Sequence, residues 1–304
     1  MQWSKVGEYI YNPYKIVNYL GNRGKLNFLS DELFLELKYR ACFNKKLDLK
    51  NPTTFNEKLQ WLKLYDRRPE YTQLVDKYAV RRYIAETIGE DYLIPLLGVW
   101  DRFEDVDFNQ LPEQFVLKST HDSGGVLICR DKSAWNIDEA RKIINKCLKR
   151  NYYYYGREWP YKNVPHKVIA EKFMTDSSNG LIDYKFFCFN GFVDCVMICI
   201  ERHLNNPQFY FFNEEWELLR LNKRGMAVPQ DFTLPKPQCI DMMFNLARKL
   251  SKGIPYLRVD FYECDEKIYF GELTFYPDSG FDINITDQAN ERWGKLIDIG
   301  ERKI

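Results

Sequence analysis

Short links between strand-like runs are the feature that most constrains the fold of this 304-residue chain. The runs FVLKST (115–120) and GVLICR (125–130) flank a glycine-containing turn, and YLRVDFYEC (256–264) is followed almost at once by KIYFGELTF (267–275). Links of this length join antiparallel neighbours, because a parallel pair needs a crossover of about a dozen residues or more. We therefore expect mainly antiparallel sheets.

Apolar, β-branched and aromatic runs predict further strands, and helical spacing predicts helices around them. A capping box formed by Thr54 and Glu57 marks the start of one helix. The pattern is that of an α+β protein preceded by a helical N-terminal region, and we divide the chain into residues 1–90, 91–172 and 173–304. The other expected strands are 168–174, 183–191, 192–202 and 208–216, and the other expected helices are 26–42, 72–88, 138–150, 238–252 and one from residue 287.

Composition excludes several classes of protein. Lys and Arg (44) nearly balance Asp and Glu (43), so the chain lacks the general basic field that holds nucleic acid. The eight cysteines include no C-x-x-C pair, which predicts a cytoplasmic protein without structural zinc. The N-terminal residues do not follow the signal-peptide pattern. The most apolar run, 92–100, is far shorter than the roughly 20 residues of a transmembrane helix, so we expect membrane contact to be peripheral at most.

Two acids in neighbouring strands suggest a metal site. Glu272 and Thr274 are two residues apart in a strand, so their side chains share one face. Asp260 lies in the preceding strand, and the short link makes it a cross-strand neighbour of Glu272. Because close carboxylates repel each other, we expect one or two Mg²⁺ ions to be held by Asp260, Glu272 and Thr274. The alternative is a pair of exposed acids on a surface hairpin.

Lysines in apolar surroundings form a second group. Lys118 ends a strand and leads into 119–125, a loop of small and hydrogen-bonding residues whose backbone N–H groups could bind phosphate. The loop does not match the Walker pattern, and an ordinary hairpin turn is the alternative. Lys77 and Lys185 also lie in largely apolar runs, where an ammonium group needs a partner.

These stretches, in this order, resemble the ATP-grasp superfamily. DKYAVRRYI is similar to its first Asp-Lys helix, FVLKSTHDSGG to its strand, lysine and flexible glycine loop, VIAEKFM to its adenine hinge, and RVDFY with YFGELTFYPDSGF to its metal-binding strands. DYKFFCFNG and GELTFYPDSGF resemble the TupA-like branch, named for teichuronopeptide biosynthesis. The resemblance covers nearly the whole chain and implies two α+β lobes with antiparallel sheets that grip ATP.

The resemblance also implies a role for each matching residue. Arg258 would neutralise charge on the transferred phosphoryl group, and Lys185 would reach the γ-phosphate; the alternatives are a simple pair with Asp260 and a solvated lysine. The superfamily usually has Glu-x-Asn where this chain has Glu272-x-Thr274, so Asp278 or Asp282 could add a metal ligand. Phe173 is expected to face the core. The residues implied in nucleotide binding are Lys77, Lys118, Ser123, Gly124, Gly125, Glu171, Lys172, Phe173 and Met174.

The activity implied by the resemblance is that of an ATP- and Mg²⁺-dependent carboxylate–amine ligase, which forms an acyl-phosphate and releases ADP and phosphate. The family context suggests that it amidates a uronic acid or related sugar acid with an amine or amino acid in capsule or teichuronopeptide synthesis. The aromatic segment 151–161 would stack on sugar rings or pack a lid onto its neighbour, and Arg202 would bind an anionic substrate. Two alternatives stay open: a glycosyltransferase, for which Asp105-Val106-Asp107 is the metal motif, and an ATP-grasp kinase or ATP-binding module.

Overall fold

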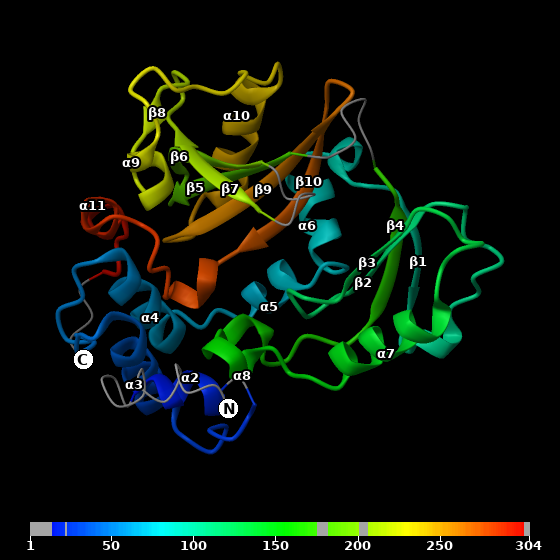
Figure 1. The fold of residues 1–304 in the computed structure, drawn as a ribbon, viewed down its shortest axis with the longest axis horizontal. Coiled ribbons are helices and arrows are strands. Elements are labelled where there is room, and N and C mark those ends of the chain that lie inside the picture. Colours follow the sequence, from blue (N-terminus) through cyan, green and yellow to red (C-terminus); the bar gives the residue numbers. More distant parts are fainter. Residues whose placement is uncertain (1–13, 22, 175–181, 201–205, 301–304) are drawn as a thin grey trace.

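The computed structural model describes residues 14–21, 23–174, 182–200 and 206–300. As expected, the fold is α+β with two antiparallel sheets, and helices precede residue 57. Figure 1 shows α2, α3 and α4 near the N-terminus, α5 and α6 between the two sheets, α7 beside the smaller sheet and α10 beside the larger one. Their bounds are α2 Lys15–Gly21, α3 Asp31–Phe43, α4 Phe55–Tyr65, α5 Glu70–Val75, α6 Val80–Thr87, α7 Ile137–Leu148, α8 Tyr153–Gly156, α9 Lys223–Ala227, α10 Ile240–Ser251 and α11 Asp287–Leu296.

The smaller sheet, on the right of Figure 1, has four strands in the order β1-β4-β2-β3. The expected hairpin of β2 (Phe115–Ser119) and β3 (Val126–Cys129) is confirmed, and β4 (Val168–Lys172) pairs with β2 on its other side. The edge strand β1 (Leu96–Trp100) had not been expected. One face packs against α7, where Ile144 and Ala140 join a buried cluster with Phe115 and Leu117.

The larger sheet has six strands in the order β10-β9-β5-β6-β7-β8. Its bounds are β5 Asp183–Phe189, β6 Phe192–Ile200, β7 Gln208–Phe212, β8 Leu218–Leu219, β9 Leu257–Cys264 and β10 Lys267–Thr274. Residues paired across neighbouring strands share a face. The register pairs Glu272 with Asp260, Asp260 with Lys185, Lys185 with Met197, and Met197 with Phe211. One face of this sheet therefore changes from charged on β10, β9 and β5 to apolar on β6 and β7.

Different helices cover the two faces of the larger sheet. α10 packs on the face opposite the charged row, where Phe244 meets Phe186 edge-to-face. On the other face, Trp293 of α11 stacks on Phe187 and also contacts Phe55 of α4. The first and last parts of the chain thus meet over the apolar end of the charged face.

Local sequence explains where two of these helices begin. The capping box at α4 is present: the Thr54 side chain accepts from the Glu57 backbone, and Glu57 binds the Thr54 backbone in return. The single helix expected over 72–88 is wrong, because α5 and α6 are separated at 76–79. The Asp76 side chain accepts from the backbone N–H groups of Tyr78 and Ala79, and this local bond competes with a continuous helix.

The two sheets lie within residues 91–172 and 173–304, and the division of the chain at residues 90 and 172 stays a prediction. Within the part of the chain that the structure describes, no helix has both the length and the apolar character that crossing a bilayer requires.

Candidate functional site

The charged face of the larger sheet brings together the residues expected at the metal-binding strands. Arg258 of β9 donates from Nε to Oδ1 of Asp260 at 2.7 Å and from Nη2 to Oδ2 at 2.7 Å. The same Nη2 lies 2.9 Å from Oε1 of Glu272 and 3.0 Å from Oγ1 of Thr274. Lys185 of β5 donates to Oδ2 of Asp260 at 2.5 Å. The expected neighbourhood of Asp260 and Glu272 is confirmed, and one guanidinium joins all three oxygen-bearing side chains.

Burial makes this cluster strongly electrostatic. Asp260 is 1% exposed, and Lys185 is buried as well. Burial alone would raise the pKa of Asp260, but Arg258 and Lys185 outweigh it and lower that pKa. Asp260 with its partners raises the pKa of Arg258 in spite of burial, so the guanidinium stays charged. The alternative of two exposed acids on a surface hairpin therefore does not describe Asp260.

The oxygen donors of this cluster fit Mg²⁺ in their chemistry. Carboxylate and hydroxyl oxygens are hard ligands, and Mg²⁺ is often held by one or two carboxylates together with phosphates and water. Arg258 and Thr274 both bind Oε1 of Glu272, which leaves Oε2 for a cation, and the Glu272 side chain is 42% exposed. Asp260 has less freedom, because both of its oxygens already bind cations. Over the described residues, no group of three or more His, Cys, Asp or Glu side chains forms a metal cage by itself.

Lys77 lies between the two sheets. Its backbone N–H donates to the carbonyl of Thr120, and its Nζ donates to the carbonyl of Asp122 at 2.5 Å, both in the loop after β2. Burial lowers the pKa of Lys77, and the nearby carboxylate of Glu272 opposes this effect while Lys118 adds to it. The break between α5 and α6 thus places one ammonium group close to residues of both sheets.

Lys118 and Glu171 form a second cluster, on the smaller sheet. Lys118 Nζ lies 2.5 Å from Oε2 of Glu171, and Arg81 Nη1 lies 3.2 Å from Oε1 of the same side chain. Glu171 is only 7% exposed, and these two cations balance its negative charge inside the protein. Arg81 also donates to the Ile94 carbonyl and thereby ties α6 to the smaller sheet.

The loop expected to close over phosphate is held at several points. The Gly125 carbonyl accepts from the Ser119 backbone, and a Cβ at Gly125 would clash with the Ser119 hydroxyl, so the backbone approaches this side chain closely. Gly124 N–H donates to the Asp122 side chain at 3.2 Å, and Ser123 donates to the Tyr152 hydroxyl at 3.1 Å. Ser123 and Gly124 are exposed, whereas Gly125 is buried.

The expected adenine hinge continues from the end of β4. The Lys172 N–H donates to the carbonyl of Pro95 at 2.9 Å, while its side chain is exposed. The expectation that Phe173 faces the core is wrong: its ring is partly exposed beneath the guanidinium of Arg130, 4.9 Å away, and it belongs to neither hydrophobic cluster. The reason is its position beyond the last paired residue of β4, where the strict alternation of the strand has ended. Met174 is also partly buried.

Sequence reasoning missed two residues near these clusters. The first is Arg81, which the sequence indicated only as part of an expected helix. Its position in the largely apolar run DKYAVRRYI was the one sign of a need for a buried partner. The second is Tyr161, whose pKa is raised by burial and by the nearby carboxylates of Glu158 and of Glu272 on the charged face. The aromatic segment that contains Tyr161 also packs Tyr153 against Asp31 of α3, which agrees with a packing role.

The residues behind the alternative functions lie elsewhere. Asp105 pairs with Arg102, and Asp107 accepts from the backbone of Asn109 and the side chain of Gln110, all on exposed turns. These contacts are those of turn-stabilising acids. Arg202 lies outside the described residues.

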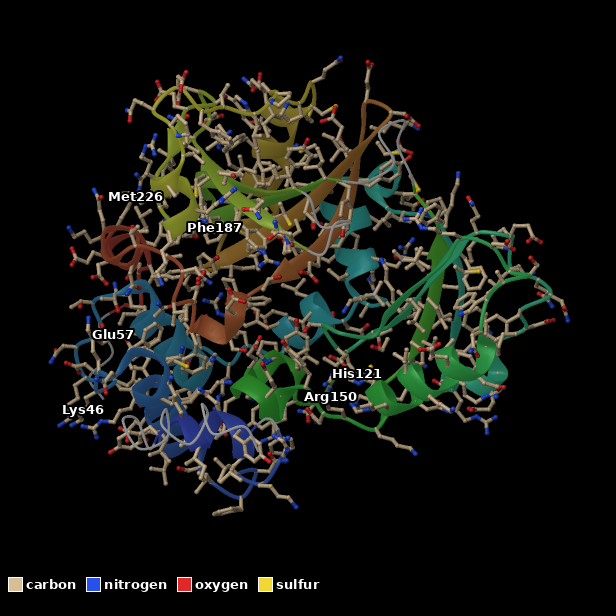
Figure 2. The ribbon with its side chains drawn as sticks, viewed as in Figure 1. Lys46, Glu57, His121, Arg150, Phe187 and Met226 are labelled. Atoms are coloured by element: carbon tan, nitrogen blue, oxygen red, sulfur yellow. The ribbon has the colours of Figure 1, made fainter. Side chains whose placement is uncertain are left out.

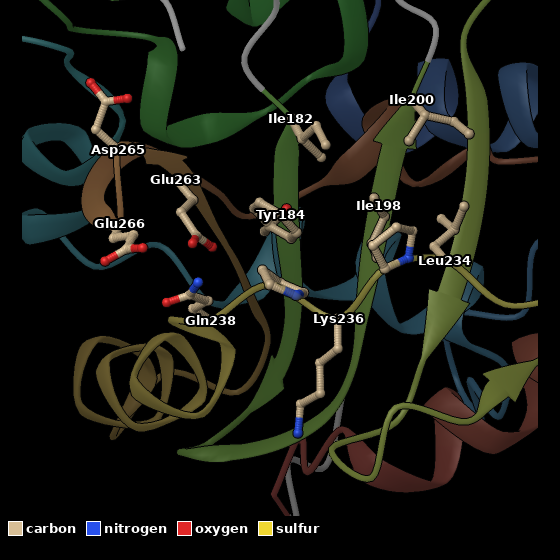
Figure 3. A pocket seen from close by; sticks show the side chains of 12 residues that line it. Ile182, Tyr184, Ile198, Ile200, Leu234, Lys236, Gln238, Glu263, Asp265 and Glu266 are labelled. Carbon is tan, nitrogen blue, oxygen red and sulfur yellow. The ribbon is translucent and has the colours of Figure 1, made fainter. Parts of the chain in front are cut away.

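Two cavities flank the larger sheet on opposite faces. Figure 3 shows the larger one, of 490 Å³, with an apolar floor that includes Tyr184 and Ile198 and an acidic side formed by Glu263 and its neighbours. Tyr184 and Ile198 are cross-strand partners and face away from Lys185, so this cavity is separate from the charged cluster. The smaller cavity, of 90 Å³, is lined by Arg258 itself.

A family model described as TupA-like ATP-grasp matches residues 57–298, which includes every element of both sheets. The chain belongs to the TupA-like ATP-grasp family. This confirms the resemblance that the sequence motifs indicated. A search of curated proteins gives no match for this ATP-grasp chain.

Solved structures of ligases are similar to this ATP-grasp protein. A D-alanine–D-alanine ligase from Bacillus anthracis, complexed with ATP, has 16% identity and a TM-score of 0.38, over 73% of this chain and 58% of that chain. An L-amino acid ligase from Bacillus licheniformis has 14% identity and a TM-score of 0.43, over 83% and 57%. A D-alanine–D-alanine ligase from Helicobacter pylori has 14% identity and a TM-score of 0.42, over 80% and 69%. The chain thus spans between 57% and 69% of the length of these ligases.

Proposed function

We propose that this protein is an ATP- and Mg²⁺-dependent carboxylate–amine ligase. The observation that carries the proposal is the cluster of Arg258, Lys185, Asp260, Glu272 and Thr274 on one sheet face of a TupA-like ATP-grasp chain. Such a cluster combines fixed positive charge for phosphate oxygens with oxygen ligands for a divalent cation.

The proposed chemistry has two steps. A carboxylate oxygen of the first substrate attacks the γ-phosphorus of ATP, and ADP leaves. An amine nitrogen then attacks the carbonyl carbon of the acyl-phosphate, phosphate leaves and an amide is formed. Activation is needed because oxide is a poor leaving group, whereas phosphate is a good one.

The residues have distinct roles in this proposal. Arg258 and Lys185 would offset the negative charge of the transferred phosphoryl group, since both are at most 12% exposed in their side chains and are oriented by Asp260. Mg²⁺, when bound, would offset charge on the phosphate oxygens, with Glu272, Thr274 and the remaining lone pair of Asp260 as its protein ligands.

Nucleotide binding would be shared between the two sheets. Lys77 and Lys118 would bind phosphate from one side, with the loop that contains Ser123, Gly124 and Gly125 above them. The hinge residues Glu171 to Met174 would border adenine. Because Lys172 N–H already binds Pro95, we assign adenine recognition in this segment to the other backbone groups.

The finer proposal concerns the substrates. We infer from the family context that the carboxylate belongs to a uronic acid or related sugar acid of a surface polysaccharide, and that the amine is an amino acid or similar molecule. A cytoplasmic site of action would supply ATP for this reaction.

Calorimetric titration of ATP, UDP-glucose and GDP-mannose with Mg²⁺ present tests the proposal. We expect Mg²⁺-dependent ATP binding in the wild type and its loss in Asp260→Asn. Product analysis then separates the alternatives: an amide with stoichiometric ADP and phosphate supports the ligase, and a phosphoester supports a kinase. Binding of a sugar nucleotide without ATP binding would replace the proposal with a glycosyltransferase.

A further inference from the structure

The smaller cavity lies directly beside the charged cluster. Arg258 and Phe187 are cross-strand partners on the same sheet face, and both line the cavity. Further walls come from α4, from α11 and from the segment that follows β10. Trp293 of α11 stacks on Phe187. A molecule in this cavity would therefore lie against Arg258, the residue proposed to act on the transferred phosphoryl group.

The wall opposite the sheet is acidic. Asp278 and Asp282 both line the cavity, and among the described residues neither forms a salt bridge. The side chain of Asp282 accepts a hydrogen bond from the backbone of Asn284 at 2.7 Å. Burial, together with the charge of Asp278, raises the pKa of Asp282. A cation bound between these two carboxylates would relieve their repulsion.

The turn that carries Asp278 is fixed in an unusual conformation. Asp278 and Ser279 both have left-handed backbone angles, with φ of 48° and 53°. Lys63 and Gln60 of α4 hold the carbonyl groups of Ser279 and Gly280, at 2.6 Å and 2.7 Å. Consecutive left-handed residues other than glycine cost free energy and persist where the surrounding structure enforces them.

A buried polar atom beside the cavity also lacks a partner. Asn56 of α4 is 1% exposed and donates from its amide nitrogen to the Asp282 carbonyl at 3.3 Å. Its Oδ1 accepts no hydrogen bond from the described residues. An unsatisfied buried acceptor costs free energy, and this one lies on α4 next to Phe55, which lines the cavity.

Size and chemistry together define the ligand. The cavity volume of 90 Å³ is smaller than the ~150 Å³ that holds benzene in an engineered protein cavity, so a whole sugar chain is excluded. The two carboxylates opposite the sheet favour a cationic group on that side of the cavity, and the aromatic wall of Phe187, Phe211 and Trp293 suits a short apolar body.

We propose that this cavity is the site of the amine substrate, a primary amine no larger than a small amino acid, or the amine-bearing end of a larger molecule. The inference rests on the proposed ligase function. The ammonium group lies between Asp278 and Asp282, and the rest of the small ligand packs on Phe187 and Trp293 beside Arg258.

The test uses the full chain, with Mg²⁺ and a non-hydrolysable ATP analogue, and NMR titration of small probes. The probes are glycinamide, ethanolamine and L-alanine, with acetamide, ethylene glycol and propionate as matched molecules that lack the amine. We expect at least one amine to bind at least 10-fold more tightly than its match. We expect the affinity for this amine to fall at least 10-fold in the double variant Asp278→Asn/Asp282→Asn. The control is Asp231→Asn, which should leave the affinity unchanged because Asp231 is exposed and does not line the cavity.

Several outcomes would overturn the inference. Equal binding of amines and their matches, tighter binding of propionate, or unchanged amine affinity in the double variant would each do so. Titration of Mg²⁺ alone provides a further check, because Mg²⁺ binding that is lost in the double variant would make these acids metal ligands instead. Intact ATP binding in these samples would confine the failure to the amine site, whereas loss of ATP binding in the wild type would contradict the ligase proposal itself.

Discussion

Glu272 is the residue whose replacement best separates chemistry from folding. Its side chain is partly exposed and contacts Arg258 through one oxygen, so Glu272→Gln keeps the shape and the neighbouring hydrogen bonds. We expect turnover to fall by about 100-fold or more, as for loss of a charge-stabilising group, with an unchanged melting temperature. Steady-state release of ADP measures the first and thermal unfolding the second.

The matched control for this prediction is Glu266→Gln. Glu266 lies in the exposed turn between β9 and β10, on the same hairpin but away from the cluster. Its replacement is expected to leave turnover unchanged. Normal turnover in a folded Glu272→Gln protein would remove Glu272 from the site.

His121 gives the protein a testable dependence on pH. The ring is 1% exposed, stacks on His166 at 3.7 Å, and lies 3.1 Å from the carbonyl groups of Cys147 and Arg150. Figure 2 shows His121 next to Arg150. Burial, and next the neighbouring His166, lowers the pKa of His121 to about 4. The unfolded chain then binds more protons between pH 6.5 and 4, so the free energy of unfolding falls as the pH falls through this range.

We expect His121→Gln to lose part of that acid sensitivity, by at most about 1.4 kcal/mol per pH unit. Urea unfolding at pH 7, 6, 5 and 4 measures the slope for both proteins. An identical slope in the variant would show that other groups cause the acid sensitivity.

At the level of single residues, strand periodicity predicted which side chains of each strand point to the charged face of the larger sheet. Period two places Glu272 with Thr274 and Arg258 with Asp260, but a register shift between Phe270 and Glu272 is needed to bring the two pairs onto one face, and the short link did not predict it. Arg81 was not predictable in the same way. Its partner Glu171 is 90 residues away, and no local pattern indicates which distant acid a helical arginine will meet.

At the level of elements, side chains that bond to the nearby backbone explain where the prediction failed. The apolar spacing over 72–88 was read as one helix, yet Asp76 stops α5 and begins the turn before α6. The Asp at this position was the available signal, because Asp often bonds to backbone N–H groups two or three residues on. The consequence reaches the site, since Lys77 lies in the resulting break.

Lys63 is the element-level feature with the largest expected effect on stability. It is fully buried, and its ammonium donates to the Gln60 side chain and to the carbonyl groups of Gly156 and Ser279, at 2.8, 2.8 and 2.6 Å. Glu158, also buried, accepts from the Ser279 hydroxyl. Lys63→Met would leave these three buried acceptors without their donor, and we expect a loss of about 3–5 kcal/mol in the free energy of unfolding.

Chemical denaturation of Lys63→Met measures this loss, with Lys58→Met as the control on the same helix. Lys58 makes one hydrogen bond, to the Ile297 carbonyl, so its replacement should cost only about 1 kcal/mol. Equal effects of the two substitutions would contradict a special role for the buried network.

At the level of the whole molecule, the placement of the two sheets relative to each other was beyond sequence patterns. Periodicity indicates which face of each strand is buried, but it carries no information about contacts between separate sheets. In Figure 1, α5 and α6 lie between the sheets. Contacts of this region with the smaller sheet and its loop include those of Lys77 with Thr120 and Asp122, and of Arg81 with Glu171 and Ile94.

These few polar contacts predict that the smaller sheet can be loosened without unfolding the larger one. Removing Arg81 deletes two hydrogen bonds and leaves Glu171 with Lys118 alone, so local opening of β1 to β4 should become easier. Hydrogen–deuterium exchange of Arg81→Met is expected to be faster in β1 to β4 and unchanged in β5 to β10. The neighbouring Arg82→Met is the control, because Arg82 is exposed and pairs only within its helix, with Glu86. Faster exchange in both sheets would show that Arg81 stabilises the molecule as a whole, and no change in either would show that apolar packing alone fixes the smaller sheet.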